Sequence, residues 1–383
     1  MSKNSLIFSK EYMSLTDWII QGSILLLFFI RLYFYFLQIK LIKFNYQALK
    51  KSYTPPVSVI IAAKNEAENL QKFLRGILEQ DYPSYEVIVV NDRSTDNTGY
   101  ILDELKKRYK HLRTTYIKPG YFKHGKKLAL TIGIKAAKYK YLVFTDADCK
   151  VVSNQWLKLI ARNFKKGSLI LGYGGYRQQP SFLNKLIRYD AIYIAILYFS
   201  KALSGKPYMG VGRNLAYAKM LYDKVKGFSS HYHVSTGDDD LFVNESSSFA
   251  TTVIETHPNS FTFSVPPHSF KSWQRQKGRH LLGSKYYSLK QKVFLALENF
   301  SRGIFYFLSI TAIIFFPHIL FPVIVILLFD LIIKYVVSGN LFRHFGGKDL
   351  IPFSILFDFI STFLIFVRLI INIFANRKYG NRL

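Results

Sequence analysis

The stretch VSVIIAA at residues 57–63 decides how the middle of this chain folds. It is a short, continuous apolar run rich in β-branched residues, which is typical of a strand buried on both faces of a sheet. The apolar residues that follow recur at three- and four-residue intervals, and they are Leu70, Phe73, Leu74, Ile77 and Leu78. This spacing predicts a helix directly after the strand, and Asp81-Tyr82-Pro83 predicts its end.

The alternation of strand and helix then repeats along the chain. EVIVVND at residues 86–92 and YLVFTDAD at residues 141–148 predict further strands, with a weaker one at residues 113–117. Residues 127–137 predict a helix, and another, carrying Ile101, Leu102 and Leu105, can be capped by Ser94, Thr95 and Asp96. Alternating β and α elements predict an α/β fold with a mostly parallel, doubly wound sheet.

Polar residues follow the predicted strands at the ends where such sheets bind ligands. They are Lys64, Asn65, Glu66, Asn91, Asp92, Asp146 and Asp148. No GxGxxG follows the first strand and no GxxxxGK[ST] occurs, so a glycine loop is not expected to hold a phosphate. Alternate side chains share one face of an extended chain, so Asp146 and Asp148 are expected to present two carboxylates to one divalent cation. An isolated DxD is weak evidence, but its position after an apolar strand favours a metal site over a loop cap.

Composition predicts a membrane component beside this globular part. Of the 383 residues, 50% are hydrophobic and 17% aromatic, and apolar segments lie at residues 18–39, 303–337 and 350–375. About 20 apolar residues can cross a bilayer, so the longest segment can form a hairpin broken around Pro317-His318 and Pro322. We expect four spans, with three as the alternative, and interpret the first as a retained anchor rather than a cleaved signal peptide.

The charge balance favours a membrane surface over nucleic acid. The chain has 52 Lys and Arg against 24 Asp and Glu, a formal charge of +28. Lys40, Lys43, Lys50 and Lys51 follow the first span, and this pattern predicts a globular part on the cytoplasmic side of an inner membrane. The single cysteine, Cys149, allows no intrachain disulfide and is compatible with a reducing compartment.

Five motifs together resemble the membrane-bound, inverting glycosyltransferases of family two, which include cellulose, chitin, hyaluronan and poly-N-acetylglucosamine synthases. They are VSVIIAAKNEAENL (57–70), VIVVNDRSTDNT (87–98), TDAD (145–148), STGDDDLF (235–242) and QKGRH (276–280). The resemblance covers roughly residues 56–280 and is more specific than any single motif. It implies a GT-A fold, a nucleotide-sugar donor, most often a UDP-sugar, and a Mg²⁺ or Mn²⁺ cofactor.

The same resemblance implies roles for the residues that follow the strands. Glu66 and Asp92 match positions that contact the uracil and ribose of the donor, and helix capping is the alternative for both. Asp148 matches the metal-coordinating carboxylate, with Asp146 beside the nucleotide and in reach of the metal. Lys126 matches a lysine near the diphosphate, and a solvated helix start is an equal alternative.

The second half supplies a base and an acceptor site. Three adjacent carboxylates repel one another, which raises at least one pKa and makes a general base; the resemblance implies Asp239 for this role, beside Asp238. A solvated acidic loop or a second cation site is the alternative. VGRNLAY at residues 211–217 resembles the family's acceptor-side segment, and its glycine allows a ligand to approach the backbone closely.

The last motif departs from the family pattern at one position. Gln276 and Arg279 match the QxxRW signature, which implies a place near the donor diphosphate, but His280 stands where the family has Trp. The broad apolar ring that carries a growing glycan is therefore missing, and processivity stays open. Trp273 can replace it or can pack in the core. His231, His233, His257 and His268 show no metal-ligand spacing and are interpreted as loop or core residues.

We therefore expect a membrane anchor at residues 1–50, a GT-A domain at residues 51–300 and a membrane domain at residues 301–383. The chain is predicted to transfer a sugar, with inversion, from a nucleotide-sugar to a saccharide or lipid-linked acceptor for glycan synthesis at the cytoplasmic face. Residues 182–203 predict either a helix at the membrane interface or a buried helix. A non-processive transfer to a lipid acceptor is the alternative within this class. A nucleic-acid enzyme and a transporter are other classes, and the first does not explain the apolar ends.

Overall fold

The computed structural model describes residues 13–44, 53–117, 125–234 and 236–379, with side chains described as far as residue 368. The chain divides into two compact units, and each is described by itself. The sheet unit comprises Leu37–Gln291 and Leu341–Leu350. The helical unit comprises the described parts of Met1–Phe36, Lys292–Asn340 and Ile351–Leu383.

A seven-stranded sheet forms the centre of the sheet unit, in the order β3-β2-β1-β4-β8-β6-β9. Its strands are β1 (Val57–Ala63), β2 (Tyr85–Asp92), β3 (Leu112–Ile117), β4 (Tyr141–Phe144), β6 (Leu169–Gly172), β8 (Leu215–Ala218) and β9 (Thr252–Glu255). Only β8 runs antiparallel to its neighbours, so the predicted mostly parallel sheet is confirmed. A second sheet of β5 (Cys149–Val151), β10 (Thr262–Ser264) and β7 (Gly174–Tyr176) was not expected from the sequence.

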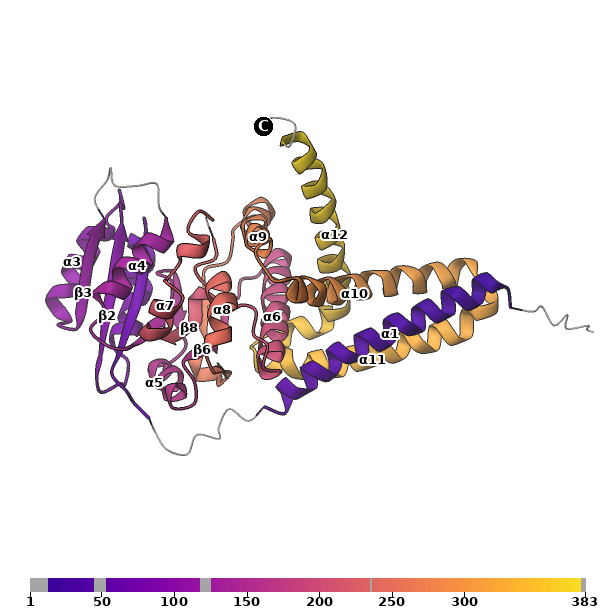
Figure 1. Ribbon diagram of the computed structural model, residues 1–383, viewed down its shortest axis with the longest axis horizontal. Coiled ribbons are helices and arrows are strands. Elements are labelled where there is room, and N and C mark those ends of the chain that lie inside the picture. The colour runs from indigo at the N-terminus through magenta and orange to yellow at the C-terminus, as the bar shows by residue number, and fades with distance from the viewer. Residues whose placement is uncertain (1–12, 45–52, 118–124, 235, 380–383) are drawn as a thin grey trace, which may run out of the picture. The chain divides into compact units, whose positions relative to one another are not determined.

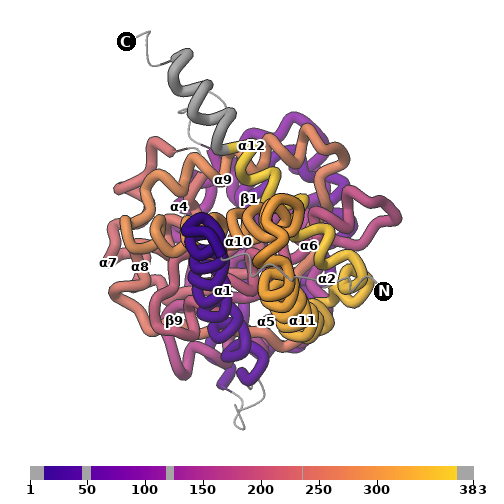
Figure 2. Tube along the Cα trace, turned by 90° about the vertical axis from the view of Figure 1, so that its right-hand side faces the viewer, coloured from indigo at the N-terminus to yellow at the C-terminus, as the bar shows by residue number. Residues whose placement is uncertain are grey.

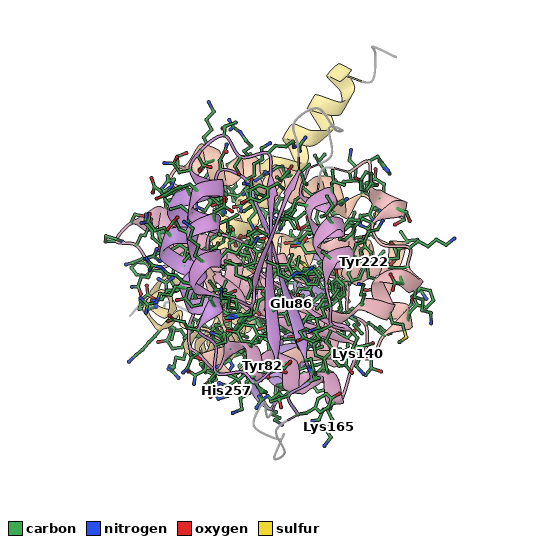
Figure 3. All side chains as sticks on the ribbon, turned by 90° about the vertical axis from the view of Figure 1, so that its left-hand side faces the viewer. Tyr82, Glu86, Lys140, Lys165, Tyr222 and His257 are labelled. Carbon is green, nitrogen blue, oxygen red and sulfur yellow. The ribbon has the colours of Figure 1, made fainter. Side chains whose placement is uncertain are left out.

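Helices cover both faces of the central sheet, and Figure 3 shows them on either side of the strands around Glu86 of β2. They include α2 (Ala67–Leu78), α3 (Thr98–Arg108), α4 (Lys126–Ala136) and α5 (Trp156–Ala161). One face of β1 packs through Val59 and Ile61 into a core shared with α2, α3 and α5. The other face meets α4, where a Cβ on Gly133 would lie 2.6 Å from Ile60. Residues that alternate along β1 thus enter two different cores, which explains why the strand is apolar at nearly every position.

The sheet unit also contains α6 (Phe182–Leu203), α7 (Lys219–Lys224), α8 (Asp240–Ser246) and α9 (Phe270–Ser284). Most of α6 is buried within the sheet unit. Arg188 of α6 forms an ion pair with Asp349 at 2.7 Å, and the Tyr189 ring stacks on Phe342 at 5.1 Å. These contacts correspond to the buried-helix alternative for residues 182–203.

The helical unit consists of four long helices, α1 (Leu15–Ile42), α10 (Leu289–Phe315), α11 (Leu320–His344) and α12 (Ser354–Tyr379). Four helices in the described residues are long and apolar enough to cross a membrane, the same number as the expected spans. The expected hairpin break lies between α10 and α11, at Phe316 and the 3₁₀ turn Pro317–Ile319. In Figures 1 and 2 the α1, α10 and α11 helices run side by side, and the Phe28 ring of α1 contacts Phe305 of α10 and Phe329 of α11.

Charged side chains are paired inside this helical unit. Arg31 of α1 binds both carboxylate oxygens of Asp330 on α11 at 2.7 and 2.8 Å, and Arg31 also donates to the Tyr306 hydroxyl. Arg302 and Lys334 form ion pairs with Asp358 on α12. All of these charged groups are at most 5% exposed. Buried charges are tolerated only when they are paired, so this network constrains how the four helices assemble.

Removing one member of the network should therefore destabilise the helical unit. Asp330→Ala leaves the Arg31 guanidinium buried without its carboxylate, and we expect a loss of about 3–5 kcal/mol in the free energy of unfolding. Thermal unfolding in detergent would record this as a lower midpoint. Leu328→Ala, at a side chain 53% exposed in the same helix, is the matched control and should change the midpoint little. An Asp330→Ala midpoint equal to that of the control would contradict the assignment.

Candidate active site

The loops that follow β1 and β2 are tied together by polar side chains. Asn65 adopts a left-handed conformation with φ of 57°, which asparagine tolerates better than most residues. Its side-chain oxygen accepts a hydrogen bond from the Thr95 backbone N–H at 2.8 Å, and its own N–H donates to the Ser94 hydroxyl at 2.9 Å. Ser94 and Thr95 therefore connect one strand-end loop to the other, and the expectation that these two residues cap α3 is wrong. Asp96 accepts a hydrogen bond from the N–H of Thr98, the first residue of α3, at 3.1 Å, as expected.

Glu66 lies at this joined pair of loops. Its backbone N–H donates to the Thr98 hydroxyl at 2.9 Å, and its carboxylate accepts from the Asn69 side chain at 2.6 Å. The carboxylate does not cap α2, so the capping alternative is wrong. Burial raises the pKa of Glu66, and the nearby Asp146 carboxylate adds to the shift. Glu66 is thus within electrostatic range of the DxD segment.

Asp92 ends β2 on the same edge of the sheet but has a different partner. Its carboxylate is buried and pairs with the adjacent Arg93 at 2.7 Å. Among the described residues, no ion pair connects Asp92 to the DxD segment. The structure therefore places Asp92 at the predicted sheet edge without a direct contact to the other acidic candidates.

The two DxD carboxylates meet in a turn rather than along a strand. Strand β4 ends at Phe144, and the Cys149 N–H donates to the Asp146 carbonyl at 3.1 Å. The expectation of an extended DxD with both side chains on one strand face is therefore wrong. The turn still gathers one ligand atom each from Asp146, Asp148 and Cys149 within 4.8 Å of one another. Burial and the nearby Asp146 carboxylate raise the pKa of Asp148 to about 6.

Lys126 joins the DxD segment to the second acidic motif. It begins α4, and its ammonium lies 2.8 Å from Asp146 and 3.0 Å from Asp238. Burial opposes the charge, but the carboxylates of Asp146, Asp238 and Asp239 hold the pKa of Lys126 well above its usual value. Lys126 is thus a paired cation and not a freely solvated helix start.

The three adjacent aspartates occupy three different environments. Burial opposes the negative charge of Asp238, but Lys126 lowers its pKa below the usual value. The Asp240 carboxylate accepts a hydrogen bond from the Tyr287 hydroxyl at 2.9 Å, and burial raises its pKa. Burial and the two neighbouring carboxylates raise the pKa of Asp239 to about 7. Groups with pKa values separated in this way can hold and transfer a proton near neutral pH.

Asp239 is fixed in position by two backbone groups. One carboxylate oxygen accepts from the Gly212 N–H and the other from the Asp240 N–H, each at 2.8 Å. A Cβ on Gly212 would lie 3.4 Å from the Lys126 ammonium and 3.5 Å from Asp239. The glycine of the VGRNLAY segment therefore lets its backbone approach this acidic cluster closely. A small crevice beside this cluster is lined by Lys126, Thr145, Asp146, Gly212, Tyr217 and Asp238, together with the apolar side chains of Leu130, Phe144 and Leu215.

Helix α9 carries the last motif. The Gln276 side chain accepts a hydrogen bond from the Tyr176 hydroxyl at 3.2 Å, and the Arg279 carbonyl accepts one from the Thr236 hydroxyl at 3.3 Å. The Arg279 and His280 side chains are exposed. Trp273 is only 2% exposed, so it packs in the core and does not provide an open sugar platform.

Two cations that were not predicted as site residues from the sequence lie within electrostatic range of the acidic residues. Lys127 is buried and donates to the carbonyls of His231 and Val234 at 2.6 and 2.9 Å, which is a structural role. Arg213, one residue after Gly212, lies within electrostatic range of Asp146 and Asp148. The sequence could have indicated Arg213 as a site residue through its position in the glycine-containing segment, because few cations occur in such buried turns.

Comparison with known proteins agrees with this architecture. Residues 58–225 match the family model described as Glycosyl transferase family 2. A poly-beta-1,6-N-acetyl-D-glucosamine synthase of Staphylococcus epidermidis is 33% identical over 210 residues, which are 53% of this chain and 47% of that protein. A probable glycosyltransferase of Bacillus subtilis is 27% identical over 284 residues, which are 70% of this chain and 63% of that protein. The chain thus spans about half to somewhat under two thirds of these relatives' lengths.

A solved structure gives the fold. The mannosyltransferase PcManGT from Pyrobaculum calidifontis, in complex with GDP-Man and Mn²⁺, matches with a TM-score of 0.56 and 17% identity, covering 88% of this chain and 98% of that one. The expected GT-A fold is therefore confirmed. The matched residues contain most of β1 and all of β2, β4 and the DxD turn, so this part of the chain is similar to a family 2 glycosyl transferase domain.

Proposed function

We propose that this chain transfers a sugar from a nucleotide-sugar to a saccharide or lipid-linked acceptor, with inversion of the anomeric configuration. The observation that carries the proposal is the pair of contacts made by Lys126, which brings Asp146 of the DxD turn and Asp238 of the acidic motif into one crevice. A donor site with a cation-binding turn and an acceptor site with a base need to be adjacent for a direct displacement.

The donor set of the DxD turn fits a hard divalent cation. Asp146 and Asp148 offer carboxylate oxygens, which Mg²⁺ and Mn²⁺ prefer. Burial and the Asp146 charge raise the pKa of Asp148, and a cation would relieve the repulsion between the two carboxylates. A bound cation would neutralise charge on the donor diphosphate. The Cys149 thiol is directed to Asp148 Oδ1 at 3.6 Å and is buried, so we assign it to support of that carboxylate.

Asp239 is the proposed base of the displacement. Its carboxylate takes the proton of an acceptor hydroxyl while that oxygen forms a bond to the anomeric carbon. The bond from this carbon to the diphosphate oxygen breaks, and its electron pair leaves with the diphosphate. One displacement of this kind inverts the configuration, and no covalent intermediate is required. Lys126, with Gln276 and Arg279 of the α9 motif, is proposed to act beside the leaving group.

Glu66 and Asp92 are proposed to bind the nucleoside part of the donor. Both lie at the carboxyl edge of the sheet, where nucleotides bind in open α/β folds. UDP-N-acetylglucosamine is the first donor to test, because the Staphylococcus relative is named as an N-acetylglucosamine polymer synthase. The four apolar helices favour a membrane protein, and the lysines that follow the first span favour a sheet unit that acts at the cytoplasmic face.

Sugar transfer by the chain can be measured directly. Membranes that contain the chain are incubated with labelled UDP-sugars and GDP-sugars, and the product is sized. A polymer indicates a processive synthase, and addition of one sugar indicates the non-processive alternative. The buried Trp273 and the exposed His280 leave no tryptophan to act as a sugar platform at the α9 motif, which favours a short product. No transfer from any donor would contradict the proposal.

Turnover should require a divalent cation held by the DxD turn. We expect EDTA and Asp148→Ala each to abolish transfer, because the diphosphate charge is then not neutralised. Asp81→Ala, at an exposed aspartate in the loop before β2, is the matched control and should keep wild-type turnover. Full activity in EDTA would overturn the metal assignment.

Substitutions at Asp239 and Asp92 should affect different steps, the first the chemical step and the second donor binding. Asp239→Asn preserves shape, so we expect nearly unchanged donor affinity and a turnover lower by roughly 10²–10⁴. Asp92→Asn should weaken the donor and spare turnover at saturation. Initial-rate kinetics and donor binding measured on both variants decide the assignment. Normal turnover with weak donor binding in Asp239→Asn would move the base to Asp238 or Asp240.

The pH profile should follow Asp239. A base acts only when deprotonated, and its pKa of about 7 means that the active form increases as pH rises through neutrality. We expect the turnover number to rise roughly tenfold between pH 6 and pH 8 and then to level off. The residual activity of Asp239→Asn should lose this rise. A profile with the same rise in both proteins would show that another group titrates.

A further inference from the structure

Arg213 is held rigidly beside the DxD turn. It lies in the 3₁₀ turn Gly212–Asn214, and its carbonyl accepts a hydrogen bond from the hydroxyl of Thr145, the residue before Asp146, at 2.9 Å. The next residue, Asn214, is fully buried and donates to the carbonyls of Tyr173 and Ser260 at 2.9 and 2.8 Å. The backbone of this arginine is therefore fixed relative to the proposed cation site.

The guanidinium group is oriented through one of its nitrogens. Nη1 donates to the Gly175 carbonyl at 3.1 Å and to the Ser264 hydroxyl at 3.2 Å, and the group lies over the Tyr176 ring at 4.3 Å. Within the described part of the chain, the Nε–H and Nη2–H groups have no acceptor. An arginine carries five N–H donors in a planar fork, and a free Nε/Nη2 edge matches two oxygens of a phosphate or carboxylate.

The charges around Arg213 favour an anionic ligand that also reaches the DxD turn. Asp146 and Asp148 act on the guanidinium electrostatically, yet among the described residues neither forms an ion pair with it. A divalent cation held by those carboxylates and the Arg213 guanidinium would present two positively charged groups to the same space. Tyr176, which lies under the guanidinium, also donates to Gln276 of the α9 motif.

We propose that Arg213 binds the phosphoryl oxygens of the donor diphosphate through its Nε/Nη2 edge and stabilises the charge of the departing diphosphate. The inference rests on the proposed function. As the anomeric C–O bond breaks, its electron pair passes to the diphosphate oxygen, and Arg213 donates hydrogen bonds to the phosphoryl oxygens that share this charge. A phosphate of a lipid-linked acceptor has the same chemistry, and the experiment distinguishes these two sources.

The test compares nucleoside diphosphate and monophosphate binding. UDP and UMP are titrated with Mn²⁺ onto the wild type, Arg213→Ala and Arg213→Lys, and turnover is measured with the donor found in the assay. We expect Arg213→Ala to lose roughly tenfold or more in UDP affinity with little change for UMP, and on the order of 10²-fold in turnover. Millimolar guanidinium should restore part of the lost turnover, and Arg213→Lys should lie between the two proteins.

Arg177→Ala is the matched control, because Arg177 is also an arginine over an aromatic ring, at 5.4 Å from Phe73, but is exposed. It should behave as the wild type. Equal losses for UDP and UMP with a lower melting temperature would show a structural role and overturn the inference. If Arg213→Ala raised only the KM for the acceptor, Arg213 would bind a phosphate of the acceptor, and the donor assignment would be overturned. A wild type without nucleotide binding or turnover would overturn the proposed function, whereas an active wild type matched by Arg213→Ala would overturn this inference alone.

Discussion

The candidate site depends on one ammonium group surrounded by carboxylates. Lys126 contacts Asp146 and Asp238, which lie in segments about ninety residues apart in the sequence. The Asp239 carboxylate is also close enough to raise the pKa of Lys126. Without this cation, several partly buried carboxylates would repel one another across the crevice. Lys126 forms its ion pairs with Asp146 and Asp238. Burial and neighbouring carboxylates raise the pKa values of Asp148 and Asp239 to about 6 and 7. The arrangement therefore gives the proposed cation site and the proposed base different electrostatic environments near one lysine.

The sequence predicted the first half of the sheet because local signals there agree with the tertiary structure. Strands β1, β2 and β4 are continuous apolar runs, and α2 has a clear helical period, so periodicity alone locates them. The small sheet of β5, β10 and β7 was missed because its strands have three residues each and pair only through long-range contacts. The DxD geometry was predicted incorrectly because a turn, not a strand, follows Phe144.

The site residues show the same division between local and tertiary information. The acidic motifs were visible in the sequence, and repulsion among adjacent aspartates predicted a raised pKa. Which aspartate is paired with Lys126 and which is tied to Tyr287 depends on partners far along the chain. Arg213 was not predicted as a site residue for the same reason. Gly175, Ser264 and Tyr176 contact the guanidinium and orient its Nε/Nη2 edge, and none of them is close to Arg213 in the sequence.

A structure of the full chain in lipid nanodiscs, with Mn²⁺ and whichever of UDP or GDP binds, would show whether the crevice binds a donor and its cation. We expect Mn²⁺ within coordination distance of Asp148, the diphosphate between the ion and Arg213, and Lys126 still in the crevice with Asp146 and Asp238. We also expect open space next to Asp239 for an acceptor hydroxyl. A nucleotide bound away from the DxD turn, with Lys126 and Asp239 remote from it, would contradict the account.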